Sequence, residues 1–147
     1  GVVQQTGKPQ EVYDDPKNLF VAKFLGTPPI NVFNGQVKDG TVYVGEDAVL
    51  KISGVEDQEV TIGIRPEGFE LDANGGLCCA LSNVEVMGRD VSIVSTHAAS
   101  ANPSVRSIID ADNKVDLSAG TVRYSIKPHK IFLFNKETEE RINFEVK

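Results

Sequence analysis

The sequence predicts a mainly β protein, in which a short helical connector at the N-terminus leads into a small, closed or partly open antiparallel β-barrel. Three observations predict this fold class. From residue 32 onward, apolar and polar residues alternate with the period of two that is typical of strands. Turn-forming residues divide this part of the chain about every ten residues, as in small barrels. Residues 1–31 instead carry prolines and capping residues in the order that marks short helices.

The connector is expected to begin with a strand and a first short helix. Val2 to Gln4 have strand character, and Thr6-Gly7 ends that pattern because glycine readily adopts turn conformations. Pro9 follows at the start of the helix, where its missing amide would have had no partner. We expect this helix to continue through Tyr13.

A second helix is expected to follow directly. Asp15-Pro16 repeats the start signal, since aspartate can cap the free amides and proline can open the first turn. Gly26 ends the helix. Leu19, Phe20 and Phe24 fall on one side of it, so we expect that side to be covered by other parts of the protein.

The remaining elements are expected to be short strands separated by turns. Asn34-Gly35, Asp39-Gly40 and Gly45-Glu46-Asp47 have the composition of hairpin turns. Later breaks are expected at Asp112-Asn113 and Ala119-Gly120, and further ones at 74–76, Gly88, 97–104 and 135–140. The later strands are expected at 60–64, 77–86, 91–96, 105–109, 121–126, 131–134 and 141–146, with a change of phase between Leu81 and Val84.

Length and charge limit the function. The 147 residues fit one domain, or one domain with an appended connector. The net charge of -6 disfavours binding to nucleic acid, because an acidic surface repels the phosphate backbone. No apolar run reaches the roughly twenty residues that a membrane-spanning helix needs, and no signal peptide is apparent.

Few residues suggest chemistry. Cys78 and Cys79 are adjacent, and neighbouring strand residues point to opposite faces, so we expect one in the core and one outside, without a redox or metal role. His97 and His129 have no acids or cysteines at metal-ligand spacing. Gly7-Lys8-Pro9 lacks the glycine loop that cradles phosphates. The sequence therefore predicts no catalytic, cofactor-binding or metal-binding residues in this chain.

One polar cluster is a candidate site. Arg65, Pro66 and Glu67 follow directly on a strand, and the proline forces an extended approach. Two interpretations are open. The cluster could be a structural corner held by an ion pair, or it could be a contact with a second copy or a regulator, for which the planar guanidinium is well suited.

A long, gapless pattern in the connector resembles a known family. Its members are Gln4, Gly7, Pro9, Glu11-Val12-Tyr13, Pro16, Asn18, Phe20-Val21-Ala22, Phe24-Leu25-Gly26, Pro28 and Ile30-Asn31. In this spacing they resemble the segment that joins two domains in ATP-binding subunits of carbohydrate ABC importers, of the maltose-transporter ATPase type. Residues 63–67, Gly-Ile-Arg-Pro-Glu, are similar to a signature of the regulatory domains in that family.

Two further stretches extend the resemblance over nearly the whole chain. Residues 84–88 resemble the strand and turn that follow the signature, and residues 132–142 resemble the closing hairpin of the family. This chain departs from the family in that hairpin. Asn135 stands where the family usually has aspartate, and Glu139-Glu140 replaces the glycine expected after Thr138.

The resemblance implies a domain division and a function. Residues 1–31 would be the connector from a missing nucleotide-binding domain, and residues 32–147 an OB-like β-barrel regulatory domain of the TOBE type. ATP and magnesium would bind in the missing domain, and the start at Gly1 without methionine suggests a fragment. The implied partners are a second copy of the ATPase subunit, the transmembrane permease subunits and a sugar-status signalling protein. The implied location is cytoplasmic, at the inner face of the cell membrane.

An alternative is a small-ligand or oxyanion-binding sensor. Related barrels at the ends of oxyanion-transporter ATPases bind molybdate or tungstate, and Ser92, Ser95, Lys114 and Arg123 could supply donors for an anion. The excess of acidic residues argues against this role. An oligonucleotide-binding barrel is disfavoured by the same charge and by the lack of a basic and aromatic strip.

Overall fold

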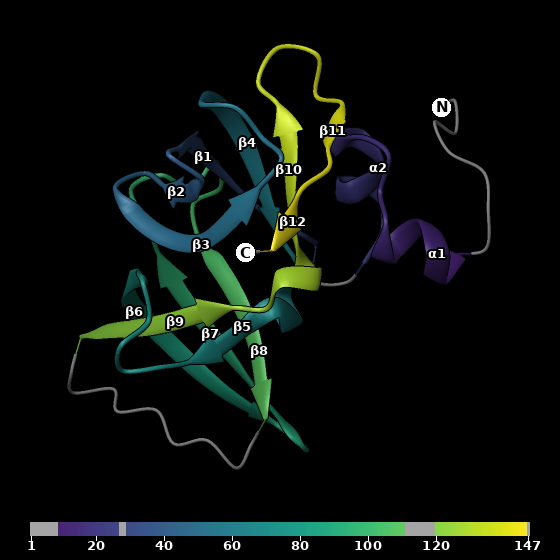
Figure 1. Ribbon diagram of the computed structural model, residues 1–147. Coiled ribbons are helices and arrows are strands. Elements are labelled where there is room, and N and C mark those ends of the chain that lie inside the picture. Colours follow the sequence, from purple (N-terminus) through teal and green to yellow (C-terminus); the bar gives the residue numbers. More distant parts are fainter. Residues whose placement is uncertain (1–8, 27–28, 111–119, 147) are drawn as a thin grey trace.

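The computed structural model describes residues 9–26, 29–110 and 120–146, and it places two antiparallel sheets beside two short helices (Figure 1). The mainly β, barrel-like fold class with a helical connector is therefore confirmed. In the described part of the chain, no helix is long and apolar enough to cross a membrane. The sequence-based strand at Val2 to Gln4 and its turn at Thr6-Gly7 lie outside the described residues, as does the break at Asp112-Asn113.

The first sheet has seven strands in the order β11-β10-β4-β1-β2-β3-β12, and it curls into a nearly closed barrel. Its two edge strands, β11 and β12, are separated in the chain by only Asn143 and Phe144, so the two edges of the sheet must lie close together. The strands are β1 (Asn31–Lys38), β2 (Thr41–Val44), β3 (Asp47–Ser53), β4 (Gln58–Ile64), β10 (Ile131–Asn135), β11 (Arg141–Ile142) and β12 (Glu145–Val146).

The second sheet has five strands in the order β5-β9-β6-β7-β8 and forms a half-barrel below the first (Figure 1). The pairing of β6 with β7 shifts register between Leu81 and Asn83, which confirms the predicted change of phase along this strand. Such a bulge inserts one residue and turns the later side chains to the other face. The strands are β5 (Phe69–Leu71), β6 (Leu77–Met87), β7 (Asp90–Thr96), β8 (Val105–Asp110) and β9 (Thr121–Ile126).

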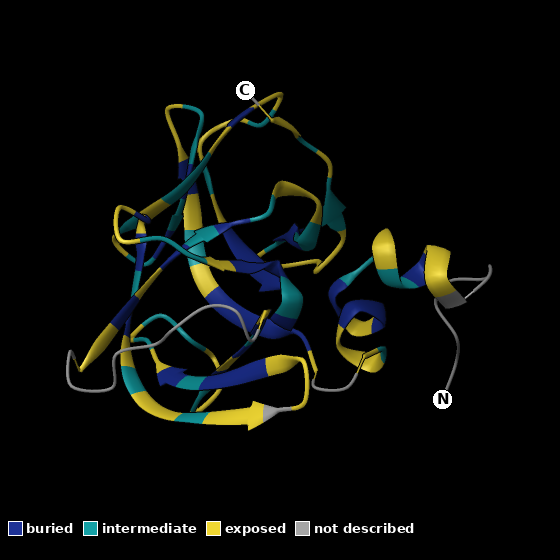
Figure 2. Cartoon of the chain, turned by 90° about the horizontal axis from the view of Figure 1, so that it is seen from below, coloured by how far each residue is buried: buried dark blue, intermediate teal, exposed yellow. Residues whose placement is uncertain are grey.

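The main core lies between the inner faces of both sheets. Phe33 and Ile62 from the first sheet and Ile93 and Tyr124 from the second are completely buried. The chain joins the sheets through two 3-10 helices, η1 (Pro66–Gly68) and η3 (Pro128–Lys130), which contact each other. Residues on the solvent side of the strands are mostly exposed, and this gives the alternation that the sequence shows (Figure 2).

The predicted hairpin turns had mixed outcomes. Asp39 and Gly40 have φ angles of 51° and 73° and join β1 to β2, as the prediction required, and Gly45 turns the chain into β3 with φ 61°. The turn predicted at Asn34-Gly35 is wrong, because both residues lie within β1. A Cβ at Gly35 would lie 2.1 Å from the Tyr43 carbonyl oxygen, so glycine serves close packing here rather than a turn.

The single strand predicted at residues 141–146 was also wrong. Residues 141–146 form two separate two-residue strands, β11 and β12, because they pair with opposite edges of the seven-stranded sheet. The other later strands lie where the alternation predicted them, and the turn at 135–140 is present. The first residue of this turn, Asn135, accepts hydrogen bonds through Oδ1 from the amides of Glu137 and Thr138.

The two connector helices are α1 (Pro9–Asp14) and α2 (Leu19–Phe24). The predicted start at Pro9 and the end at Gly26, which has φ 102°, are confirmed. The cap of α2 is Asn18 rather than Asp15, since Asn18 Oδ1 accepts a hydrogen bond from the amide of Val21 at 2.9 Å. Asp15 is instead bonded to a distant arginine, described below.

The predicted buried side of α2 was only partly correct, because Leu19 is buried as expected but Phe20 and Phe24 are not. Leu19 and Ala22 are buried against Phe132 and Phe134 of β10, whereas the side chains of Phe20 and Phe24 are 53% and 74% exposed. Ala22 is small, which allows the helix to approach the aromatic side chains of the sheet closely. Figure 2 shows buried and exposed residues on this one helix. Tertiary packing therefore decided which side faces the barrel.

Candidate functional site: the connector clamp

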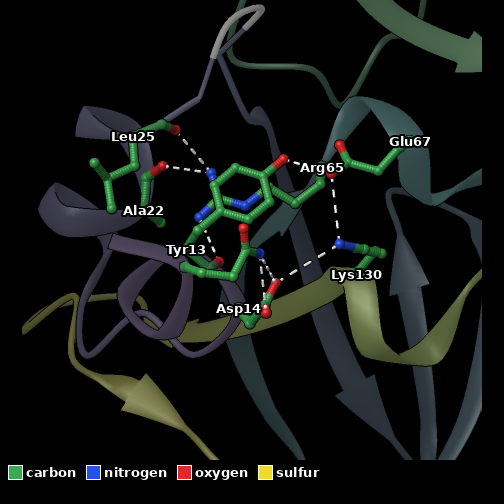
Figure 3. Close-up of polar contacts among 8 residues, drawn as sticks. Tyr13, Asp14, Ala22, Leu25, Arg65, Glu67 and Lys130 are labelled. Atoms are coloured by element: carbon green, nitrogen blue, oxygen red, sulfur yellow. Dashed lines mark hydrogen bonds and ion pairs between the residues drawn. The ribbon is translucent and has the colours of Figure 1, made fainter. Parts of the chain in front are cut away.

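The most elaborate polar arrangement among the described residues surrounds Arg65. This residue follows β4 and has an extended backbone with φ -64° and ψ 146°, as expected before a proline. Its side chain reaches the connector and is 1% exposed. Nη1 donates hydrogen bonds to the carbonyl oxygens of Ala22 and Leu25, and Nη2 donates to that of Tyr13, each at 2.9 Å (Figure 3).

These carbonyl groups lie at the C-terminal ends of the two connector helices. The last carbonyls of a helix have no partner within it, and the helix dipole makes this end favourable for a cation. Tyr13 belongs to the last turn of α1, and Ala22 and Leu25 belong to the end of α2. One arginine from the barrel therefore caps both helices and fixes their positions relative to each other.

Tyr13 covers the guanidinium group. The centroid of its ring lies 3.9 Å from Arg65 Cζ, a distance typical of a cation–π contact. The Tyr13 hydroxyl donates a hydrogen bond of 2.5 Å to Oε2 of Glu67. Lys130 Nζ lies 3.5 Å from the same carboxylate oxygen and 3.8 Å from Asp14 Oδ1. Charged groups from the barrel and the first helix thus close around the ring.

The environment shifts the pKa values of these groups. Burial raises the pKa of the Tyr13 hydroxyl well above its ordinary value, and the bond to Glu67 adds to the effect. Burial alone would raise the pKa of Glu67, but the hydrogen bond from Tyr13, its own backbone amide and Lys130 together hold it below the ordinary value. Burial lowers the pKa of Arg65, although an arginine remains protonated in proteins.

A second arginine holds the segment between the helices. Arg141 Nη1 donates to Asp15 Oδ1 at 2.9 Å and to the Pro16 carbonyl at 3.0 Å. The ring of Phe132 lies 4.6 Å from Arg141 Cζ and 5.7 Å from Arg65 Cζ. We call Tyr13, Arg65, Glu67, Lys130 and Arg141 the connector clamp.

Backbone hydrogen bonds support this second contact. The Leu19 amide donates to the Glu139 carbonyl at 3.0 Å, and the Arg141 amide donates to the Lys17 carbonyl at 2.9 Å. The closing hairpin of the barrel is therefore joined to the connector by main-chain as well as side-chain bonds.

The candidate residues from the sequence all lie at this junction. Arg65 and Pro66 are buried, and Glu67 is half-buried at the rim. Their proposed contact with a second copy or a regulator stays a prediction. Sequence reasoning did not single out Lys130 and Arg141. Both lie more than sixty positions from Arg65 in the chain, so no local pattern could join them to it.

The histidines and cysteines have structural surroundings. His97 lies 2.8 Å from Asp47 Oδ2 through Nε2, and its Nδ1 accepts the amide of Ala99, so the imidazole ties the loop at 97–104 to β3. As predicted, Cys79 is buried and Cys78 is partly exposed, and burial raises the pKa of the Cys79 thiol to about 12. Across the described ranges, no three His, Cys, Asp or Glu side chains gather as metal ligands.

The residues considered for an anion do not converge in the described part of the chain. Ser92 and Ser95 are buried in the half-barrel. Arg123 lies on the exposed face of β9, where Nη1 donates to the Gly75 carbonyl at 2.9 Å. Lys114 lies outside the described residues.

The fold and the clamp define a class of protein: a β-barrel module whose helical connector is locked against it. Comparison with known proteins gives the family. Residues 31–71 match the family described as the CysA C-terminal regulatory domain, a range that includes Arg65 and Glu67. The chain is similar to C-terminal regulatory domains of the ATP-binding subunits of ABC importers.

Three relatives show the extent of the similarity, each over 97% of this chain. The diacetylchitobiose uptake system ATP-binding protein MsiK of Streptomyces coelicolor is 30% identical, with 44% of its length covered. The sn-glycerol-3-phosphate import ATP-binding protein UgpC of Jannaschia sp. is 30% identical, with 40% covered. The oligosaccharides import ATP-binding protein MsmX of Bacillus subtilis is 32% identical, with 42% covered. The chain thus spans about two fifths of the length of these relatives.

Proposed function

We propose that this chain is the regulatory and dimerisation domain of the ATP-binding subunit of a carbohydrate ABC importer. The parent polypeptide would bind and hydrolyse ATP with magnesium to drive import, and the 147 residues of this chain would not. The names of the relatives support this proposal, since each is an ATP-binding protein of an uptake or import system. The matched family, a C-terminal regulatory domain, supports the position of the chain within the parent.

The connector clamp is the observation that carries the proposal. Residues 1–31 are taken as the connector and residues 32–147 as the barrel. Arg65 holds the ends of both helices, so a movement of the connector must be accompanied by a movement of the barrel. A clamp of this kind suits a domain that transmits force between an ATP-binding domain and a partner, and it requires no chemistry of its own.

The proposed partners are a second copy of the subunit, the membrane permease subunits and a sugar-status signalling protein. The location that follows is cytoplasmic, at the inner face of the membrane. The Arg65-Pro66-Glu67 corner would act in a partner contact through its accessible rim, where the half-buried Glu67 and Lys130 lie. Arg65 and Pro66, which are buried beneath this rim, would hold it in position.

The first experiment compares the isolated chain with the complete gene product. We expect magnesium-dependent ATP hydrolysis by the complete polypeptide and none by the 147-residue chain. Nucleotide turnover by the isolated chain, or its binding of ATP at micromolar concentrations, would contradict the proposal. Sedimentation of both proteins over a range of concentrations measures the contribution of the barrel to the dimer.

A second experiment tests the clamp in the complete polypeptide. In Arg65→Met, we expect ATP binding to remain and the affinity of subunits for each other to fall, because the barrel is no longer fixed to its connector. The matched control is Arg123→Met, since Arg123 is exposed and its side chain donates to the Gly75 carbonyl, far from the connector clamp. Equal dimer affinities in the two variants would exclude a role for the clamp in assembly.

A further inference from the structure

The five-stranded sheet is open along one side. Its edge strands, β5 and β8, lie near each other (Figure 1), but no ladder of hydrogen bonds joins them in the part of the chain that the structure describes. Four antiparallel pairings lead from β5 through β9, β6 and β7 to β8, so β5 and β8 run in the same direction. We call the opening between these two edges the seam. An extended segment placed in it would run antiparallel to both strands.

Main-chain groups of β5 point into the seam. The Asp72 amide, just after this strand, donates to the Arg123 carbonyl of β9 at 3.1 Å. Residues of an antiparallel pair alternate between positions that bond to the partner strand and positions that face away from it. The amide and carbonyl of Leu71, one residue before Asp72, therefore face away from β9 and toward the seam.

The side chain of Asn31 shows which residues of β8 face the seam. Its Nδ2 donates to the Arg106 carbonyl at 2.8 Å, and its Oδ1 accepts from the Arg106 amide at 2.9 Å. The main-chain groups of Arg106 thus face away from β7, and by the same alternation so do those of Ile108. A side-chain amide offers the donor and acceptor of a peptide group. Asn31 therefore occupies one end of this edge in the way that an added strand would.

A groove lies between the remaining part of the β8 edge and β5. Phe69 and Ile109, which are 1% and 6% exposed, contribute apolar side chains to it. Asp90 and Asp110 occupy directly opposite positions in the pairing of β7 with β8, where like charges repel each other. The charged residues that line the groove are Glu67, Glu70, Asp90, Asp110 and Lys127. The lining is therefore strongly acidic.

We propose that this groove binds a short extended segment of a partner protein that carries lysine or arginine at every second position. The main chain of the segment pairs with the β8 edge at Ile108, and its basic side chains, which share one face of the strand, lie against Glu70 and Asp90. This inference rests on the proposed function, to which it adds the chemistry of the partner. Glu67 belongs both to the connector clamp and to the groove, so the bound segment lies beside the clamp.

Charge favours a basic partner over a second copy of this chain. The net charge of the chain is -6, so a second copy would bring further acidic groups to an acidic groove. A basic segment is instead attracted before it docks, because charges at physiological salt interact over about 8 Å. The main-chain bonds then supply affinity, while the alternate side chains supply specificity.

Peptide binding tests the groove in the 147-residue chain and in the complete polypeptide. The probe is a fluorescein-labelled Lys-Val-Lys-Val-Lys-Val peptide, and the control peptide has glutamate in place of lysine. One variant combines Glu70→Gln with Asp90→Asn. Its matched control combines Glu56→Gln with Glu59→Gln, which removes the same charge at two exposed positions outside the groove. A third variant, Ile108→Pro, removes the amide that faces the seam and keeps the bonds to β7. Fluorescence anisotropy measures the Kd.

We expect the basic peptide to bind and the acidic peptide not to bind. The loss of two rim charges should weaken binding about tenfold and Ile108→Pro about fivefold, with no change in the matched control. Equal binding of the two peptides, or equal weakening in the charge variant and its control, would overturn the inference. The charge variants decide the test if Ile108→Pro does not fold. A complete polypeptide that hydrolyses ATP but binds no basic peptide contradicts this inference alone, whereas one that binds the peptide but no ATP contradicts the proposed function.

Discussion

Arg65 and Arg141 both contact the connector and both lie near the ring of Phe132, yet their surroundings differ. Arg65 is 1% exposed and bonds to three neutral carbonyl oxygens. The Arg141 side chain is 17% exposed and bonds to one carbonyl and to Asp15, whose side chain is 78% exposed. The first contact is a buried cap for two helices, and the second is a surface ion pair that includes one backbone bond.

From this difference we expect burial, more than charge pairing, to decide how much each contact contributes to stability. When a buried hydrogen-bond donor is removed, neither water nor another protein group can bond to the acceptors that it leaves. The loss of stability is therefore larger than the net contribution of one hydrogen bond. When one member of an ion pair at the surface is removed, water solvates the other member, and this restores most of the lost interaction. We therefore expect the Arg65 contact to dominate the docking of the connector.

The largest effect is expected for Arg65→Met. Loss of the guanidinium leaves three helix-end carbonyls without donors, and we expect a loss of about 3 to 5 kcal/mol in the free energy of unfolding. Urea unfolding measures it, and trypsin cleavage at Lys17 and Lys23 reports release of the connector. Arg65→Lys restores the charge but cannot reach three carbonyls in a fixed plane, so it should recover less than half of the loss. Full recovery with lysine would show that charge, rather than geometry, holds the connector.

Apolar packing beneath α2 gives a reference loss of stability with which both arginine variants can be compared. Leu19→Ala removes a buried side chain that packs against β10, and we expect a loss of about 2 to 3 kcal/mol. The matched control is Phe24→Ser on the exposed side of the helix, which should change the stability of the isolated chain by about 0.5 kcal/mol or less. Thermal or urea unfolding compares them. Similar losses in the two variants would mean that other parts of the chain cover Phe24.

A pH series measures what the half-buried Glu67 contributes to stability, separately from the buried carbonyl bonds of Arg65. Glu67 has a lowered pKa when folded, so its contribution to stability is fully present above the ordinary glutamate pKa of about 4.3 and is lost as the pH falls through the folded value. Tyr13→Phe removes the hydroxyl bond while keeping the ring, and should cost about 1 kcal/mol at neutral pH. The stability difference between the wild type and Glu67→Gln, measured from about pH 6 to about pH 3, should shrink as the pH falls. A constant difference would show that the carboxylate is not coupled to folding.

The smallest effect among the clamp residues is expected for Arg141→Ala. The Asp15 side chain of this ion pair is 78% exposed, so water can solvate the carboxylate and we expect a loss of about 1 kcal/mol or less. The part that depends on Asp15 should decrease further at about 1 M salt, where charges are screened within a few ångströms. A loss equal to that of Arg65→Met would remove the distinction between the two arginines. Unfolding in urea at low and high salt supplies the measurement.

Much of the fold could be predicted from local sequence. The period of two placed most strands, Asp39-Gly40 gave the correct hairpin, and the change of phase after Leu81 proved to be a bulge. The corner at Arg65-Pro66 was also apparent. Local composition was misleading at Asn34-Gly35, where close approach of Tyr43, not a turn, requires glycine.

The sequence by itself determined the mainly β class, the helical connector and the position of the corner, because strand alternation, capping and proline geometry act over a few residues. Only the tertiary structure decided that Arg65 caps both helices, that Arg141 reaches Asp15 across 126 positions, and that Leu19 rather than Phe24 is buried. These outcomes depend on which surfaces meet after the chain folds. A six-residue helix has too little intrinsic stability to choose its own orientation, so the barrel chooses it.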